Sequence, residues 1–229
     1  MRTSQPEITD AAHLYEYYRG QENEQIRVKI MKDLERTDIG NPDYKQDLVA
    51  SGENQLFNVL NAYAMFDKEI SYCQGINFIV MLLLKHLRNE EDAFYCLVHV
   101  MQNHDWRGCY DLYTSKLINL LELLECILET GYPEVYNHIM TEIEISLVPV
   151  FASIIQTIFI YDSPEHIATH IFDVFLLDGD SVIFTVLIKM IELKEEKILA
   201  TEGHELLDYL RKEMSEECLR EFSMDTLMD

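Results

Sequence analysis

The chain has 229 residues, 48% of them hydrophobic, and a chain of this length buries roughly 70–75% of its unfolded surface. It carries 41 acidic and 18 basic side chains, a formal net charge of −23, and residues 117–184 contain no Lys or Arg. This balance disfavours direct binding to nucleic acid or to an anionic membrane, because phosphate groups are held by clustered basic side chains. With only 8 Gly and 5 Pro, the composition favours long helices over a turn-rich β protein.

Cysteine usage and the hydropathy profile indicate a cytoplasmic chain. The five cysteines are an odd number and include no C-x-x-C pair, which indicates buried free thiols in a reducing compartment. The first residues have no apolar signal core. The longest apolar run, residues 147–161, contains Pro149 and falls short of the about 20 residues that cross a bilayer. We therefore expect no transmembrane segment.

Apolar stripes at helical spacing predict most of the first half of the chain. After a frayed polar start, helices are expected over residues 12–18, from residue 22 onward, through residues 56–63 and over residues 76–87. The second of these rests on Ile26, Ile30 and Leu34, which recur every four residues. Residues 37–52 hold Gly40 and Pro42 and read as a surface loop.

The second half of the chain carries helix start and stop signals. Asn89 is expected to cap one helix, and Gly131 followed by Pro133 separates the next two. The remaining helices are predicted over residues 149–160, from Ser163 as N-cap and Pro164 as first residue to Gly179, over 182–193 with Asp180 as N-cap, and over 204–222.

No alternating strand pattern and no repeat period of 20–50 residues occurs. The predicted fold class is all-α, as a single large multi-helix domain or as two helical lobes. We expect residues 1–21 to form a partly frayed N-terminal segment, residues 22–200 the functional domain, and residues 201–229 an acidic C-terminal helix that packs on it.

Two polar clusters stand out as candidate sites. Gln74 and Gly75 lie where an apolar run begins, an unusual place for an amide, and Gly75 permits a sharp turn or a close backbone approach. Thirty-eight residues before Gln74 stands Arg36, three residues after Asp33, so that the two charged side chains share one helix face.

These clusters resemble the signature motifs of the TBC domain, the family that activates GTP hydrolysis by Rab GTPases. The pattern I-x-x-D-x-x-R is matched at Ile30, Asp33 and Arg36, and the pattern Y-x-Q-G at Tyr72, Gln74 and Gly75. The resemblance extends over roughly residues 22–200 through the segments Leu56-x-x-Val59-Leu60-x-Ala62-Tyr63 and Ile171-Phe172-Asp173-Val174-Phe175-Leu176. The chain departs from the family at Asp38 and Ile39, in place of an aromatic residue and Pro, and at Ser71, in place of the frequent Gly.

The resemblance implies a GTPase-activating protein for a Rab-type small GTPase in its GTP form, acting in vesicle traffic. Arg36 would be an arginine finger and Gln74 a glutamine finger that replaces the glutamine of the GTPase. Asp33 would orient Arg36, while Tyr72 and Gly75 would support Gln74. The chain would need no cofactor of its own, since GTP and Mg²⁺ belong to the GTPase, and any membrane association would be indirect, at endomembranes. The alternative is a catalytically silent module of the same fold that binds a GTPase or another partner as an effector or scaffold.

Other chemistries have weaker support. His166 and His170 are four residues apart, but neither the H-E-x-x-H pattern nor a nearby third zinc ligand is present. Cys73 has no neighbouring His to activate it, and no G-x-x-x-x-G-K-[ST] loop exists, so the chain is not expected to bind GTP itself. Asp33 with Arg36 could be an ordinary ion pair, Gln74 a buried amide, and Asp173 a structural residue of its helix.

Overall fold

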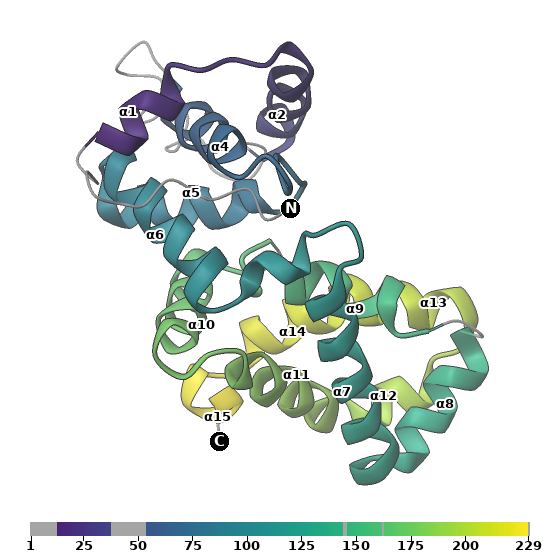
Figure 1. Cartoon of the computed structure of the whole chain (residues 1–229). Coiled ribbons are helices and arrows are strands. Elements are labelled where there is room, and N and C mark those ends of the chain that lie inside the picture. Colours follow the sequence, from purple (N-terminus) through teal and green to yellow (C-terminus); the bar gives the residue numbers. More distant parts are fainter. Residues whose placement is uncertain (1–12, 38–53, 144–145, 162, 229) are drawn as a thin grey trace. The chain divides into compact units, whose positions relative to one another are not determined.

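A computed structural model describes residues 13–37, 54–143, 146–161 and 163–228. Every regular element in these ranges is a helix, so the all-α prediction is confirmed (Figure 1). The chain divides into two compact units, residues 1–99 and 100–229, which are treated separately below. The predicted loop over residues 37–52 and the departures at Asp38 and Ile39 fall on residues 38–53, outside the described ranges, although Thr37 is the last residue of a helix.

The described residues of the first unit form five helices, and the last of them extends past residue 99. They are α1 (Leu14–Arg19), α2 (Glu24–Thr37), α4 (Gln55–Phe66), α5 (Ile76–Leu87) and α6 (Glu90–Asn103). Asparagine side chains cap three of them, as helix starts favour. Asn23 accepts from the backbone of the first turn of α2, Asn54 does so at α4, and Asn89 does so at α6, as predicted for Asn89.

Helix α4 contacts α1, α2 and α5 and lies among them in Figure 1. Its side chains Val59 and Leu60 are fully buried, together with Ile30 of α2 and Ile79 of α5. The predicted stripe on α2 is therefore real, although Ile26 is only half-buried. These contacts fix where the end of α2 and the start of α5 lie, and both ends carry candidate site residues.

The second unit contains a 3₁₀ turn, η2 (Trp106–Cys109), and a run of further helices. These are α7 (Ser115–Gly131), α8 (Pro133–Ile143), α9 (Val148–Gln156), α10 (Glu165–Asp178), α11 (Ser181–Leu193), α12 (Glu195–Ala200), α13 (Gly203–Asp208), the π-helical turn Tyr209–Glu213, α14 (Met214–Glu221) and α15 (Met224–Met228). Helix α7 contacts η2, α8 and α9, and α11 contacts α10, α12, α14 and α15.

One backbone carbonyl organises the core around Trp106. The oxygen of Gln156 accepts from Trp106 Nε1 at 3.1 Å and from the Tyr110 hydroxyl at 2.7 Å. The side-chain amide of Gln156 donates in turn, through Nε2, to the carbonyl of Cys109 at 2.8 Å. The indole also packs edge-on against Phe175, with ring centroids 4.9 Å apart. Because these polar groups bond one another, they are buried without the cost of unpaired donors.

Two predicted helix ends are wrong, and a third lacks the expected side-chain cap. Helix α9 ends at Gln156 and not near residue 160, because Ile158 and Phe159 take positive φ angles of 52° and 62°. Helix α10 begins at Glu165, with Pro164 extended at the N-cap position, so Ser163 does not cap it. Asp180 occupies the N-cap position of α11, as predicted, but its side chain forms no cap, and its carboxylate pairs with Lys116 at 3.0 Å.

All five cysteines are free, as expected, but they are not uniformly buried. Cys109 and Cys218 are buried, Cys73 and Cys96 are half-buried, and Cys126 is exposed on the outer face of α7. Within the described ranges, no single helix has the length and apolar character to cross a membrane; α8 and α9 meet those criteria only when joined, and they are bent by 111°.

Candidate functional site

Gln74 lies in the turn that leads into α5, and its side chain is exposed. The amide of Ile76 donates to the carbonyl of Cys73 at 3.4 Å, so that Gln74 and Gly75 are the two central residues of the turn. Gly75 has a φ of 106°, a conformation that strains any residue with a Cβ. An exposed amide on a tight turn contradicts the alternative of a buried core amide and leaves Gln74 open to a partner.

A buried hydrogen bond joins the two motifs. The hydroxyl of Tyr72 donates to Oδ2 of Asp33 at 2.7 Å, across 39 residues of sequence. Each of these two residues is only 6% exposed, so water does not compete for the bond. The resemblance implies that Asp33 orients Arg36 and that Tyr72 supports Gln74, as two separate roles. In the structure, Asp33 and Tyr72 are also hydrogen-bonded to each other.

Arg36 lies in the last turn of α2, three residues after Asp33. Its backbone is described as helical, and its side chain lies outside the described part of the structure. The Asp33–Tyr72 bond thus connects the helix that carries Arg36 to the segment that carries Gln74. The segments that carry the two predicted finger residues are thus joined by one buried hydrogen bond.

The backbone on either side of Gln74 adopts conformations that side chains normally avoid. Ser71 has a φ of 57°, and its amide donates to the carbonyl of Asp67 at 2.6 Å. A left-handed residue at this position explains why the frequent residue in the resembling motif is Gly. Asn77, noted in the sequence only as part of the motif, is 2% exposed, and its Oδ1 accepts from the amide of Gly75 at 2.9 Å.

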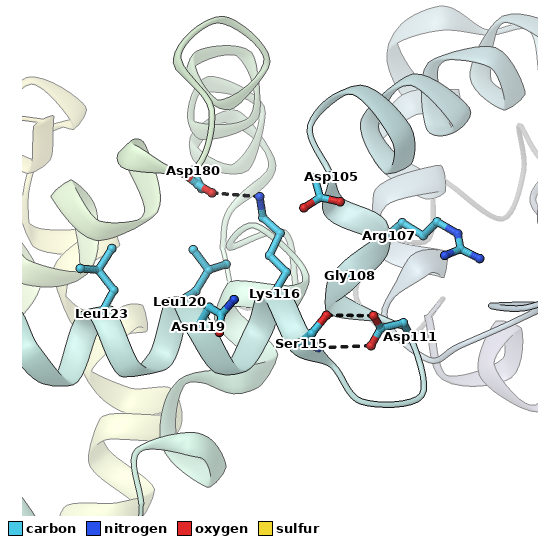
Figure 2. Close-up of a pocket in the computed structure, with 10 residues that line it drawn as sticks. All are labelled: Asp105, Arg107, Gly108, Asp111, Ser115, Lys116, Asn119, Leu120, Leu123 and Asp180. Atoms are coloured by element: carbon cyan, nitrogen blue, oxygen red, sulfur yellow. Dashed lines mark hydrogen bonds and ion pairs between the residues drawn. The ribbon is translucent and has the colours of Figure 1, made fainter.

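A second candidate is a cleft of about 430 Å³ in the second unit, which no sequence pattern had indicated (Figure 2). Its lining includes Lys116, which pairs with Asp180 at 3.0 Å and donates to the carbonyl of His104 at 3.1 Å. Asp111 accepts from the hydroxyl of Ser115 at 2.9 Å.

These pairings give the cleft a structural role. The Lys116–Asp180 pair ties the start of α7 to the connection between α10 and α11, and Lys116 also lies over the Trp106 ring, 5.5 Å from its centroid. In Figure 2 the Arg107 side chain points away from this pair. The cleft therefore offers no cluster of cations for a phosphate group. Asp173 and the two histidines, His166 and His170, lie on α10, and no group of three or more metal-ligating side chains occurs in the part of the chain that the structure describes.

Comparison with known proteins identifies a family whose model covers both motifs. A family model described as the Rab-GTPase-TBC domain matches residues 3–199. The chain is 32% identical over 224 residues to the Rab GTPase-activating protein eat-17 of Caenorhabditis elegans, covering 98% of this chain and 24% of that protein. It is 34% identical over 183 residues to TBC1 domain family member 4 of Mus musculus, covering 80% of this chain and 14% of that protein. The chain thus spans a quarter or less of the length of these two relatives.

Solved structures agree on the fold. The crystal structure of the Chlamydomonas flagellar RabGAP TBC domain superposes with a TM-score of 0.76 at 21% identity, covering 96% of this chain and 73% of that one. The Ypt/Rab-GAP domain of Gyp1p superposes with a TM-score of 0.70 at 15% identity, covering 88% of this chain and 74% of that one. At these identities the likeness establishes the arrangement of the helices.

Proposed function

Because this chain belongs to the Rab-GTPase-TBC domain family, we propose that it accelerates GTP hydrolysis by a Rab-type small GTPase in its GTP form. The observation that carries the proposal is the buried Tyr72–Asp33 hydrogen bond, which holds the segment of the exposed Gln74 against the helix of Arg36. Two residues suited to phosphoryl transfer, 38 positions apart, are thereby supported together.

The chemistry needs a cation and an amide. A small GTPase hydrolyses GTP slowly because charge on the transferred phosphoryl group is poorly compensated and the attacking water is poorly held. Arg36 would supply a permanently charged fork of donors for the phosphoryl oxygens, an effect worth about 10³–10⁵ in rate. Gln74 would accept a hydrogen bond from the water through its carbonyl and donate to a phosphate oxygen through its NH₂ group.

The remaining residues would act on geometry. Asp33 and Tyr72 would hold α2 and the Gln74 segment together, and Gly75 would allow the turn that displays Gln74. A misplacement of about 1 Å can cost about 100-fold in rate, so a rigid support matters as much as the finger residues.

GTP and Mg²⁺ would be bound by the GTPase, and this chain would contribute no nucleotide site of its own. The GTPase would also determine where the chain acts, which would be at the cytoplasmic face of endomembranes, in vesicle traffic. The net charge of −23 fits a protein partner better than direct contact with anionic lipid.

The test is single-turnover GTP hydrolysis by a panel of purified Rab-type GTPases with and without this chain. On a GTPase that responds, Arg36→Ala and Arg36→Lys should each lower the stimulated rate by about 100-fold or more, because Lys keeps the charge and loses the fork. Gln74→Ala should lower the stimulated rate by a similar factor, and a GTPase whose own glutamine is replaced by Leu should still respond to the unmodified chain. Arg27→Ala and Gln102→Ala, at exposed positions in the first part of α2 and in α6, serve as matched controls.

The competing proposal is a binding module that docks a GTPase without accelerating hydrolysis. It would be favoured if a GTPase bound the chain in its GTP form while its hydrolysis rate stayed at the basal value. Full stimulation by both Arg36→Ala and Gln74→Ala would show that acceleration does not depend on these two residues.

A further inference from the structure

Asn77 is the second residue of α5, three residues after Gln74 in the sequence, and its side chain is one of the few buried polar ones in the described part of the first unit. Its Oδ1 accepts a hydrogen bond from the backbone amide of Gly75 at 2.9 Å. Gly75 is the N-cap residue of α5 and has no side chain with which to cap the helix. Asn77 therefore reaches back to the N-cap amide, as the glutamate of a capping box does from the third position.

This bond fixes the orientation of one particular peptide group. The amide of Gly75 lies in the same rigid plane as the Cα and the carbonyl of Gln74. Holding the Gly75 N–H therefore fixes the Cα–C bond of Gln74 and restricts the directions in which its side chain can leave the turn.

The turn needs such a restraint. Gly75 sits at a φ of 106°, and glycine reaches both positive and negative φ with ease, so its own conformational preference does not select this geometry. Gln74 is exposed and receives little support from packing. The buried Asn77 side chain, which accepts from the Gly75 amide, favours this conformation of Gly75 over the others.

We propose that Asn77 is the positioning residue of Gln74: its carboxamide holds the Gln74–Gly75 peptide in the orientation that presents Gln74 to the GTPase-bound nucleotide. The inference rests on the proposed function of Gln74 and adds a residue to that site. Asn77 itself touches no substrate in this scheme.

Removal of the acceptor should lower kcat and spare KM. Asn77→Ala should reduce the stimulated single-turnover rate at saturating concentration of this chain by about 10- to 100-fold, the cost of a misplaced catalytic group, with the half-saturating concentration unchanged within about twofold. Asn77→Asp keeps an acceptor oxygen, and a negative charge is favoured in the first turn of a helix, so it should recover most of the rate. If Asn77→Ala does not fold, Asn77→Ser, whose oxygen stands one bond closer to the backbone, takes its place.

A matched control separates positioning from general stability. Asn61 is also 2% exposed in the first unit, and its Nδ2 donates to the carbonyl of Gln21 at 2.7 Å, away from the Gln74 turn. Asn61→Ala should lose thermal stability comparable to that lost by Asn77→Ala and retain the stimulated rate. Circular dichroism melts of both variants give the comparison.

The decisive measurement is the double variant with Gln74→Ala. If Asn77 acts through Gln74, adding Asn77→Ala to Gln74→Ala should change the rate no further, because the residue it positions is already gone. A further loss equal to that of the single Asn77→Ala variant would overturn the inference, as would a single Asn77→Ala variant with an unchanged rate. Full activity of Gln74→Ala alone would instead overturn the proposed role of Gln74.

Discussion

The Tyr72–Asp33 hydrogen bond can be removed by deleting a single atom. Tyr72→Phe takes away the hydroxyl that donates to Asp33 Oδ2 at 2.7 Å and leaves the ring in place. Because Tyr72 and Asp33 are each 6% exposed, water cannot readily take over as donor, and the carboxyl group loses a buried partner.

Loss of one partner of a buried hydrogen bond costs about 1–3 kcal/mol. For a domain of 150–250 residues, 1 kcal/mol corresponds to roughly 2–4 °C in Tm, so the chain of 229 residues should melt about 2–12 °C lower. The stimulated rate should fall as well, by about tenfold or more, because both predicted finger residues stand on the support that this bond closes.

The assay combines thermal melts with single-turnover GTP hydrolysis and uses Tyr110→Phe as the control. Tyr110 is 5% exposed, and its hydroxyl donates to the carbonyl of Gln156 at 2.7 Å in the second unit. The same atom is deleted from a bond in the second unit, so Tyr110→Phe should lower stability and keep its GTPase-activating rate.

A double-mutant cycle with Asp33→Ala measures the bond itself, because alanine has no acceptor for the Tyr72 hydroxyl. The two substitutions should be non-additive by more than about 0.5 kcal/mol, the level within which independent sites usually add. Additive losses, or a Tyr72→Phe variant with unchanged stability and unchanged rate, would refute the view that this bond supports the site.

Three further predictions concern the second unit. Gly108→Ala should destabilise it by about 1–3 kcal/mol in urea unfolding, because the new Cβ would lie 2.9 Å from the Cβ of Lys116; wild-type stability would contradict the close approach. Burial raises the pKa of the Cys109 thiol to about 12, so iodoacetamide should leave it unmodified at pH 8 in the native protein while the exposed thiol on α7 reacts, as peptide mass spectrometry can check. The hydrogen bond from Lys197 holds the pKa of Glu217 below its ordinary 4.5, so the stability it contributes is present above pH 4.5 and is lost as the pH falls through the lowered pKa; Glu217→Gln should therefore lower Tm at pH 7, and the difference from wild type should shrink as the solution is acidified below pH 4.5.

Most helices follow from local signals that the structure repeats. Asn89 caps α6 as its position before an acidic first turn predicts, and Gly179 ends α10 with a φ of 77°. In both cases the signal and the group that it satisfies lie within one turn of each other. Sequence reading succeeds where the deciding interaction is local.

The end of α9 shows where local reasoning fails. Ile158 and Phe159 adopt positive φ, which their side chains disfavour, and both are fully buried. Burial of two large apolar side chains offsets the strain, and the carbonyl of Gln156 is bonded to the side chains of Trp106 and Tyr110. These partners lie 46 and more residues away in sequence, so no pattern around residue 157 indicates the break.

The candidate site likewise has a part that the sequence predicts and a part that only the tertiary structure shows. The residue types of both motifs, and the turn at Gly75, could be predicted from their order and spacing. The Tyr72–Asp33 partnership could not, because it depends on how α2 packs against α4 and α5, which only the tertiary structure determines. The roles of Arg36 and Gln74 in catalysis stay predictions.

The losses from removing the two supporting hydrogen bonds should differ. Tyr72 bonds to the helix of Arg36, so Tyr72→Phe should disturb both predicted finger residues, whereas the bond that Asn77 accepts from the Gly75 amide acts on the peptide next to Gln74. A Rab-type GTPase that retains its own glutamine could supply part of the water-holding function when Gln74 is misplaced, and one with that glutamine replaced by Leu could not. Asn77→Ala should therefore lose more of the stimulated rate on the substituted GTPase than on the unmodified one. Tyr72→Phe also weakens the placement of Arg36, which neither GTPase form can compensate, so part of its loss should be common to both. If Asn77→Ala lost the same fraction of the rate on the two GTPase forms, its hydrogen bond would not act through Gln74.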